Sequence, residues 1–147
     1  MGDKLEITAL GGLSIKQDGE PITGLASRKA EALLVYLACT GKPQSREKLA
    51  ELLWEERSQS RSLSNLRVVL SSLRKHLGKY ITITRDTVTL NQAADIWLDT
   101  ADLEEKLAAG QPEAAVSLYK GDFLGSFYLR GAAQFEQWVM EERARLH

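Results

Sequence analysis

Leucine residues recur at three- and four-residue steps over one segment, and this spacing constrains the fold more than any other feature of the chain. They are Leu63, Leu66, Leu70, Leu73 and Leu77. At about 100° per residue they form one narrow stripe on an α-helix, with Val69 beside it. The pattern predicts a helix over residues 60–77 that ends at Gly78 and buries this stripe.

The opposite face of the predicted helix is polar, small and basic. It presents Arg61, Ser64, Asn65, Val68, Ser72 and Lys75, and one flank presents Arg67 and Arg74. Cations combined with amide and hydroxyl groups are the side chains with which a helix reads bases and phosphates in the major groove of DNA.

Charge is segregated along the chain. Residues 57–85 hold seven Lys or Arg and no acidic residue, whereas residues 86–147 hold five Lys or Arg against eleven Asp or Glu. The formal net charge of −1 therefore conceals a strongly positive segment. Such a segment predicts a surface that meets a polyanion, and nucleic acid is the commonest one. A solvated helix face is the alternative interpretation.

The chain before this segment is predicted to form a small antiparallel meander and two helices. Residues 4–10 and 13–16 alternate apolar and polar side chains, and the Asp-Gly pair at 18–19 is favoured in tight hairpin turns. Ser27 and Ser45 are the predicted N-caps of the two helices that follow.

A β-hairpin is predicted after the leucine-rich helix. Residues 80–84 and 88–90 alternate and are rich in β-branched side chains, and Arg85 lies in the turn between them. A small sheet, three helices and a hairpin, in this order, predict a winged helix-turn-helix of the α+β class over residues 1–93. Such a fold turns its third helix and its hairpin, or wing, toward DNA, and the basic segment covers both.

The composition changes after residue 93. Helices are predicted over residues 100–109, 113–119 and 132–146, as a TPR-like helical segment of the kind that stacks into superhelical repeats. The acidic pair Asp99 and Asp102 is interpreted as helix-start and surface charge. Because residues 86–147 are acidic, we expect this segment to avoid phosphates and to contact other proteins instead.

Three stretches of the sequence, taken in order, resemble a known family. They are RKAEALLVYLA at 28–38, SREKLAELLW at 45–54 and NLRVVLSSLRKHL at 65–77. The chain resembles the bacterial regulators typified by the Streptomyces antibiotic regulatory proteins, in which an OmpR/PhoB-type winged-helix domain precedes a bacterial transcriptional activator domain. The stretch LYKGDFL at 118–124 is similar to the start of that second domain, so residues 94–147 are expected to be its N-terminal part, truncated.

The resemblance implies a cytoplasmic, sequence-specific double-stranded DNA-binding regulator that activates transcription. Its third helix would enter the major groove and its wing would touch the backbone. Dimers or tandem copies would bind direct repeats near a promoter and contact RNA polymerase.

Candidate DNA-binding residues divide by the chemistry they offer. Asn65 can pair with adenine through two hydrogen bonds, and Arg61 or Lys75 can reach guanine or phosphate. Ser64, Val68 and Ser72 share that face. The residues assigned to phosphates are Arg67, Arg74, Lys79 and Arg85.

An enzyme is not expected. The chain has two His, one Cys and no glycine-rich phosphate loop, metal-ligand cluster or nucleophile elbow, so no catalytic residue, metal or cofactor is predicted. The longest apolar stretch, residues 32–39, is too short to span a bilayer, so no membrane association is predicted. The alternative function is an adaptor whose basic helix binds an acidic protein.

Overall fold

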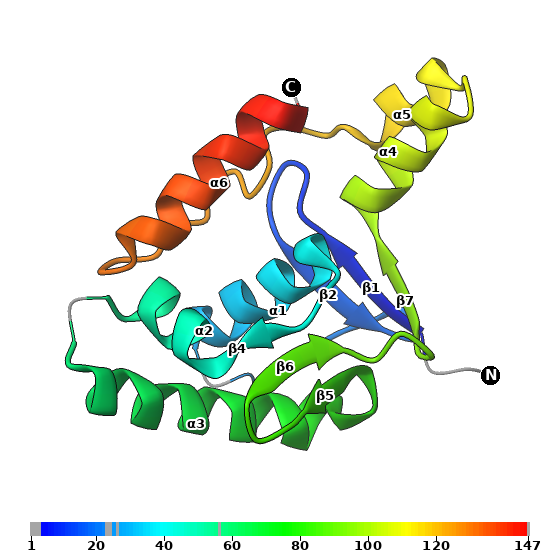
Figure 1. The fold of residues 1–147 in the computed structure, drawn as a ribbon. Helices are drawn as coiled ribbons and strands as arrows, with labels where there is room; N and C mark the ends of the chain where they lie inside the picture. Colours follow the sequence, from blue (N-terminus) through cyan, green and yellow to red (C-terminus); the bar gives the residue numbers. More distant parts are fainter. Residues whose placement is uncertain (1–3, 23–24, 26, 56, 147) are drawn as a thin grey trace. The chain divides into compact units, whose positions relative to one another are not determined.

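The computed structural model describes residues 4–22, 25, 27–55 and 57–146. These residues form two compact units, each a mixture of helices and one small sheet (Figure 1). The first unit combines residues 4–22, 95–128 and 139–146, and the second combines the described residues up to 94 that follow residue 22 with residues 129–138. No described helix has the length and apolar character that crossing a membrane requires.

Three helices of the second unit begin at serine caps. They are α1 (Arg28–Thr40), α2 (Arg46–Leu53) and α3 (Gln59–Leu77). The side chains of Ser27, Ser45 and Ser58 each accept a backbone N–H of the first turn, at 3.0–3.3 Å. The predicted caps Ser27 and Ser45 are confirmed. The third helix starts at Gln59, one residue before the predicted start, because Ser58 caps it.

A three-stranded sheet accompanies these helices. Its order is β4 (Gln44–Ser45), β6 (Thr87–Leu90) and β5 (Ile81–Ile83), all antiparallel, and a short 3-10 turn η1 (Gly78–Tyr80) joins α3 to β5. The predicted hairpin is confirmed as β5 and β6. Strand β4 was not predicted, because two residues are too few to show an alternating pattern.

Residues 129–138 add an aromatic cluster to the second unit. Phe135 is fully buried, and the Trp138 ring lies 4.8 Å from the Tyr36 ring of α1 and 5.6 Å from the Phe135 ring. Phe135 and Trp138 belong to the first turns of α6 (Ala133–Leu146). The compact units therefore do not follow the predicted division into residues 1–93 and 94–147. The division into a winged-helix domain over residues 1–93 and a helical domain over residues 94–147 stays a prediction.

The first unit is built on a four-stranded sheet. Its order is β3 (Glu20–Pro21), β2 (Ser14–Gln17), β1 (Lys4–Thr8) and β7 (Asp95–Leu98). The first three strands form the predicted antiparallel meander, and both residues of the turn at 18–19 have positive φ. Strand β7 was not predicted as a strand, and it pairs with β1 in parallel.

Two helices follow β7 in the first unit, α4 (Asp99–Ala108) and α5 (Pro112–Leu118). Asp99 is buried at the start of α4, and its carboxylate accepts the N–H groups of Ala9 and Leu10 at 2.9–3.0 Å. Burial raises the pKa of Asp99, and the backbone donors oppose that rise. Asp99 lies in the first turn of α4, as predicted for a helix-start charge, but its interpretation as a surface charge was wrong, because β7 brings it beside the end of β1.

Candidate nucleic-acid interface

Helix α3 buries one face in the second unit. The buried residues are Ser62, Leu66, Val69, Leu70, Leu73 and Leu77. Leu63, which was predicted to belong to this face, is only half-buried. The buried face is therefore rotated toward Val69 and includes Ser62. The Ser62 hydroxyl can be buried because it donates a hydrogen bond to the Ser58 carbonyl at 2.8 Å.

The centre of the exposed face lies opposite the buried residues. Arg61, Ser64, Val68 and Lys75 are exposed there, as predicted, and Ser71 is exposed beside them. Ser71 was missed by sequence reasoning. It follows Ser64 by seven residues, nearly two helical turns, so the helical period alone identifies it.

The other predicted residues lie along the two margins of this face. Asn65 and Ser72 are half-buried on one margin, and Arg67 and Arg74 are exposed on the other. All eight residues predicted on α3 therefore reach solvent, two of them only in part. The basic residues Arg74 and Lys75 also lie in the last turn, where a cation stabilises the helix dipole.

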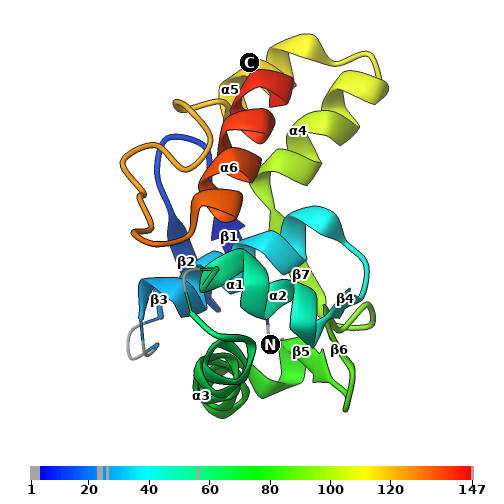
Figure 2. The same cartoon turned by 60° about the vertical axis from the view of Figure 1, so that its left-hand side comes forward.

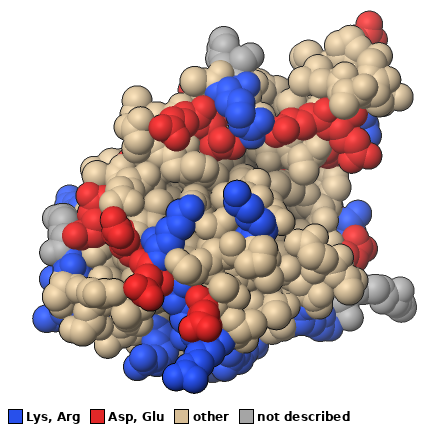
Figure 3. Space-filling view, viewed as in Figure 1, with Lys and Arg blue, Asp and Glu red and all other residues tan. Residues whose placement is uncertain are grey.

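The basic residues of α3 belong to a stretch of sequence that lacks acidic residues. Residues 57–85 contain no Asp or Glu. Figure 3 shows Lys and Arg side chains gathered at the lower edge of the view, where Figure 1 draws α3. Within the segment itself no carboxylate opposes the positive field, which attracts anions.

Hydrogen bonds fix the tip of the β5–β6 hairpin. Within the turn, the Thr84 and Thr87 hydroxyls lie 2.9 Å apart, and the Thr87 N–H donates to the Thr84 hydroxyl at 2.9 Å. The Arg46 guanidinium donates twice to the Thr84 carbonyl, at 2.8 and 3.1 Å. The exposed Arg85 is thus presented on a fixed turn. Sequence reasoning missed Arg46, because residues this far apart leave no local signal.

Lys79 lies between α3 and the hairpin and is exposed. The Asn91 side chain donates to the Lys79 carbonyl at 3.1 Å, and the Asn91 N–H donates to the Tyr80 carbonyl at 2.8 Å. Strand β5 packs against α3, and both cartoon views draw the hairpin beside that helix (Figures 1 and 2). The predicted residues on α3, η1 and the hairpin therefore belong to one neighbourhood of the second unit.

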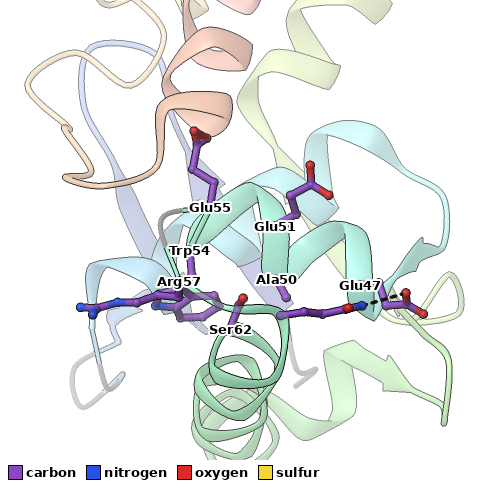
Figure 4. Close-up of a pocket in the computed structure, with 8 residues that line it drawn as sticks. Glu47, Ala50, Glu51, Trp54, Glu55, Arg57 and Ser62 are labelled. Atoms are coloured by element: carbon purple, nitrogen blue, oxygen red, sulfur yellow. Dashed lines mark hydrogen bonds between the residues drawn. The ribbon is translucent and has the colours of Figure 1, made fainter.

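A pocket of about 310 Å³ lies where α2 meets the start of α3 (Figure 4). Its lining includes Glu47, Glu51 and Glu55. The Gln59 side chain donates to Glu47 at 3.3 Å, and Gln134 donates to Glu51 and Glu55 at 3.1 and 2.9 Å. Because these carboxylates repel phosphate, the pocket is not part of the candidate interface.

Comparisons with known proteins bear on the fold. No protein-family model matches the sequence, and no curated protein matches it significantly. A solved structure of Mycobacterium tuberculosis EmbR, in complex with a low-affinity phosphopeptide, is similar to the chain with a TM-score of 0.68 and 24% sequence identity. The chain has a fold similar to that of EmbR. The match covers 99% of this chain and 44% of that one, so the chain spans less than half of EmbR's length.

Proposed function

We propose that the chain is a sequence-specific double-stranded DNA-binding part of a bacterial transcriptional regulator of the Streptomyces antibiotic regulatory type. The observation that carries the proposal is the exposed face of α3, which is basic and polar and lies in a segment without acidic residues. The second unit is interpreted as a winged helix-turn-helix, in which β5 and β6 form the wing. The fold shared with EmbR, a transcriptional regulator, supports this interpretation.

Helix α3 has the dimensions and surface for major-groove binding. An α-helix is about 10–12 Å in diameter with its side chains, and the major groove of B-DNA is about 12 Å wide. The exposed centre of α3 faces the bases in this arrangement. Arg67 and Arg74 on one margin, Lys79 after the helix and Arg85 on the wing then contact phosphates.

Residues of the centre and of the other margin are proposed to read bases. The Asn65 amide offers a donor and an acceptor to adenine, and Arg61 or Lys75 offers donors to guanine or phosphate. Ser64 and Ser72 offer hydroxyl groups that suit either a base edge or a phosphate.

The acidic helical segment is proposed to serve protein contacts. Helices α4 and α5 and the later part of α6 would form the start of a TPR-like activator domain. The proposed targets are RNA polymerase and a second copy bound to the adjacent direct repeat. Phosphate would repel this segment, whose acidic residues outnumber its basic ones.

Duplex binding measured against salt tests the proposal. Each contact between a cation and a phosphate contributes about 0.9 to the slope of log affinity on log salt. The variants are Arg67→Gln, Arg74→Gln, Lys79→Gln and Arg85→Gln, with the exposed Lys120→Gln as control. Each of the four should lower the slope by about one unit, and the control should not.

The adaptor hypothesis predicts a different result in the same assay. A basic face that serves an acidic protein should bind polyglutamate as tightly as duplex DNA and should show no preferred duplex in selection from random sequences. Tight, selective binding to one duplex sequence contradicts the adaptor hypothesis. Absence of duplex binding contradicts the proposed function.

A further inference from the structure

Val68 is an apolar residue at the centre of a basic and polar helix face. Its side chain is 64% exposed. The residues one turn away on either side are Ser64, Asn65, Ser71 and Ser72. The three serine side chains are shorter than valine, so they do not cover its methyl groups. An exposed aliphatic side chain in this position gains nothing from water and cannot bind phosphate.

Two cations bracket Val68 along the helix. Arg61 precedes it by seven residues and Lys75 follows it by seven, so both lie nearly two turns away on the same face. At 1.5 Å per residue, each is about 10 Å from Val68 along the axis. In the proposed complex, with Arg61 and Lys75 at the two ends of the contact, Val68 would lie over the floor of the major groove.

Only one base presents an apolar group in the major groove, and that base is thymine, through its C5-methyl group. Cytosine presents an amino group there instead, which donates a hydrogen bond to the carboxylate of Asp or Glu. Residues 57–85 contain neither Asp nor Glu. We propose that Val68 determines specificity by contacting the C5-methyl group of a thymine in the bound duplex. This inference rests on the proposed function and adds the base that the centre of α3 selects.

Uracil substitution tests the contact without changing the protein. The full chain is first used to select its preferred duplex, and each thymine of that duplex is then replaced in turn by deoxyuridine, which lacks only the methyl group. Affinity should fall about fourfold at one position, the factor that corresponds to burying one methyl group. At the other thymines the affinity should be unchanged.

A substitution in the protein, combined with the uracil substitution in the DNA, completes a double-mutant cycle. Val68→Ala should weaken binding to the thymine duplex by a similar factor and should not distinguish thymine from uracil at that position. Val116→Ala is the matched control, because Val116 is 69% exposed and lies on α5 in the first unit. This control should keep both the affinity and the uracil penalty of the unchanged chain.

Three results overturn the inference. One is a chain that binds its preferred duplex selectively and tolerates uracil at every position, which leaves the proposed function intact. Another is a Val68→Ala variant that retains the full uracil penalty or the full affinity, as expected if Val68 faces a protein instead. A chain that binds no duplex overturns the inference together with the proposed function.

Discussion

The two compact units differ in how far apart in the sequence their contacts lie. Most of the second unit comes from the stretch of chain between residues 25 and 94, and the three helices of that stretch, α1–α3, each begin at a serine cap. The first unit joins three separate segments, and Asp99 bonds to Ala9 across 90 residues. Local patterns specify α1–α3 and the hairpin of the second unit, whereas the first unit depends on partners that the local sequence does not reveal.

The units also differ in how their cations are used. In the first unit, Lys106 pairs with Asp102 at 3.0 Å, and Arg145 pairs with Glu142 and Glu104 at 2.7 and 2.9 Å. Residues 57–85, by contrast, contain no acidic residue, so no ion pair forms within that segment. Lys106 and Arg145 are thus neutralised by carboxylates of their own unit, whereas the cations of α3 lie in a segment that contains no carboxylate.

The largest expected effect concerns this contrast. Replacing both Arg67 and Arg74 by Glu should weaken duplex binding on the order of hundredfold or more, because two charge-assisted contacts become repulsive. Fluorescence anisotropy at constant salt measures the loss. Lys120→Glu, an exposed charge reversal in the first unit, is the control and should change binding little. Equal losses in both proteins would mean that overall charge, and not the face of α3, governs binding.

The next effect is on stability and belongs to the first unit. Asp99→Ala leaves the buried N–H groups of Ala9 and Leu10 without an acceptor, so the free energy of unfolding should fall by about 2–4 kcal/mol. Urea unfolding measures it. The affinity of the folded variant for the duplex should stay within about twofold of that of the unchanged chain. A twofold change in affinity corresponds to less than about 0.5 kcal/mol of binding free energy. A stability within experimental error of the unchanged chain would contradict the role given to Asp99.

The same carboxyl group gives a pH dependence of defined sign. Because burial raises the pKa of Asp99 in the folded state, the folded chain binds that proton more strongly than the unfolded chain. The stabilisation that comes from this stronger proton binding is fully present below the ordinary pKa of Asp99 and is lost as the pH rises through the raised pKa. Lowering the pH from neutrality should therefore stabilise the unchanged chain relative to Asp99→Asn. A constant difference across this range would show that the pKa is not raised.

A smaller effect is expected for base reading on α3. Asn65→Ala should cost about 1–3 kcal/mol on the preferred duplex and should relax selectivity at one base pair. Selection from random duplexes with the variant measures both. Equal weakening on all sequences would show that Asn65, which is half-buried at the margin of the face, contacts only the backbone.

The smallest effect concerns the wing. Arg46→Ala removes both bonds to the Thr84 carbonyl, so amide exchange at residues 84–87 should accelerate and duplex binding should weaken about two- to fivefold. Arg145→Ala removes a similar paired guanidinium in the first unit and should change neither quantity. A salt slope lowered by about one unit in Arg46→Ala would instead indicate that Arg46 itself contacts phosphate.

The sequence predicts the elements of the second unit well, for local reasons. Serine caps, the glycine at position 41 with positive φ and the leucine stripe of α3 each act within a few residues. The candidate interface follows from the same periodicity, which is why every residue predicted on α3 reaches solvent. The half-burial of Leu63 departs from the stripe because packing of α3 favours the side of Val69.

The first unit shows what local patterns omit. Strand β7 carries only four residues, and nothing in Asp95–Leu98 specifies β1 as its partner. The burial of Asp99 follows from that pairing, so it was equally hidden. Arg46 illustrates the same limit within the interface, because its acceptor lies 38 residues away.

The parallel pairing of β1 with β7 has a consequence for the order in which the chain becomes structured during synthesis. Strand β1 is made before its partner, which follows about 90 residues later, and at a translation rate of roughly 5–20 residues per second this is a delay of about 5–20 s. Helices α1–α3 and the hairpin leave the ribosome within that interval. On a nascent chain, β1 therefore exposes an unpaired edge until β7 arrives, and an exposed edge is where strands of different chains associate.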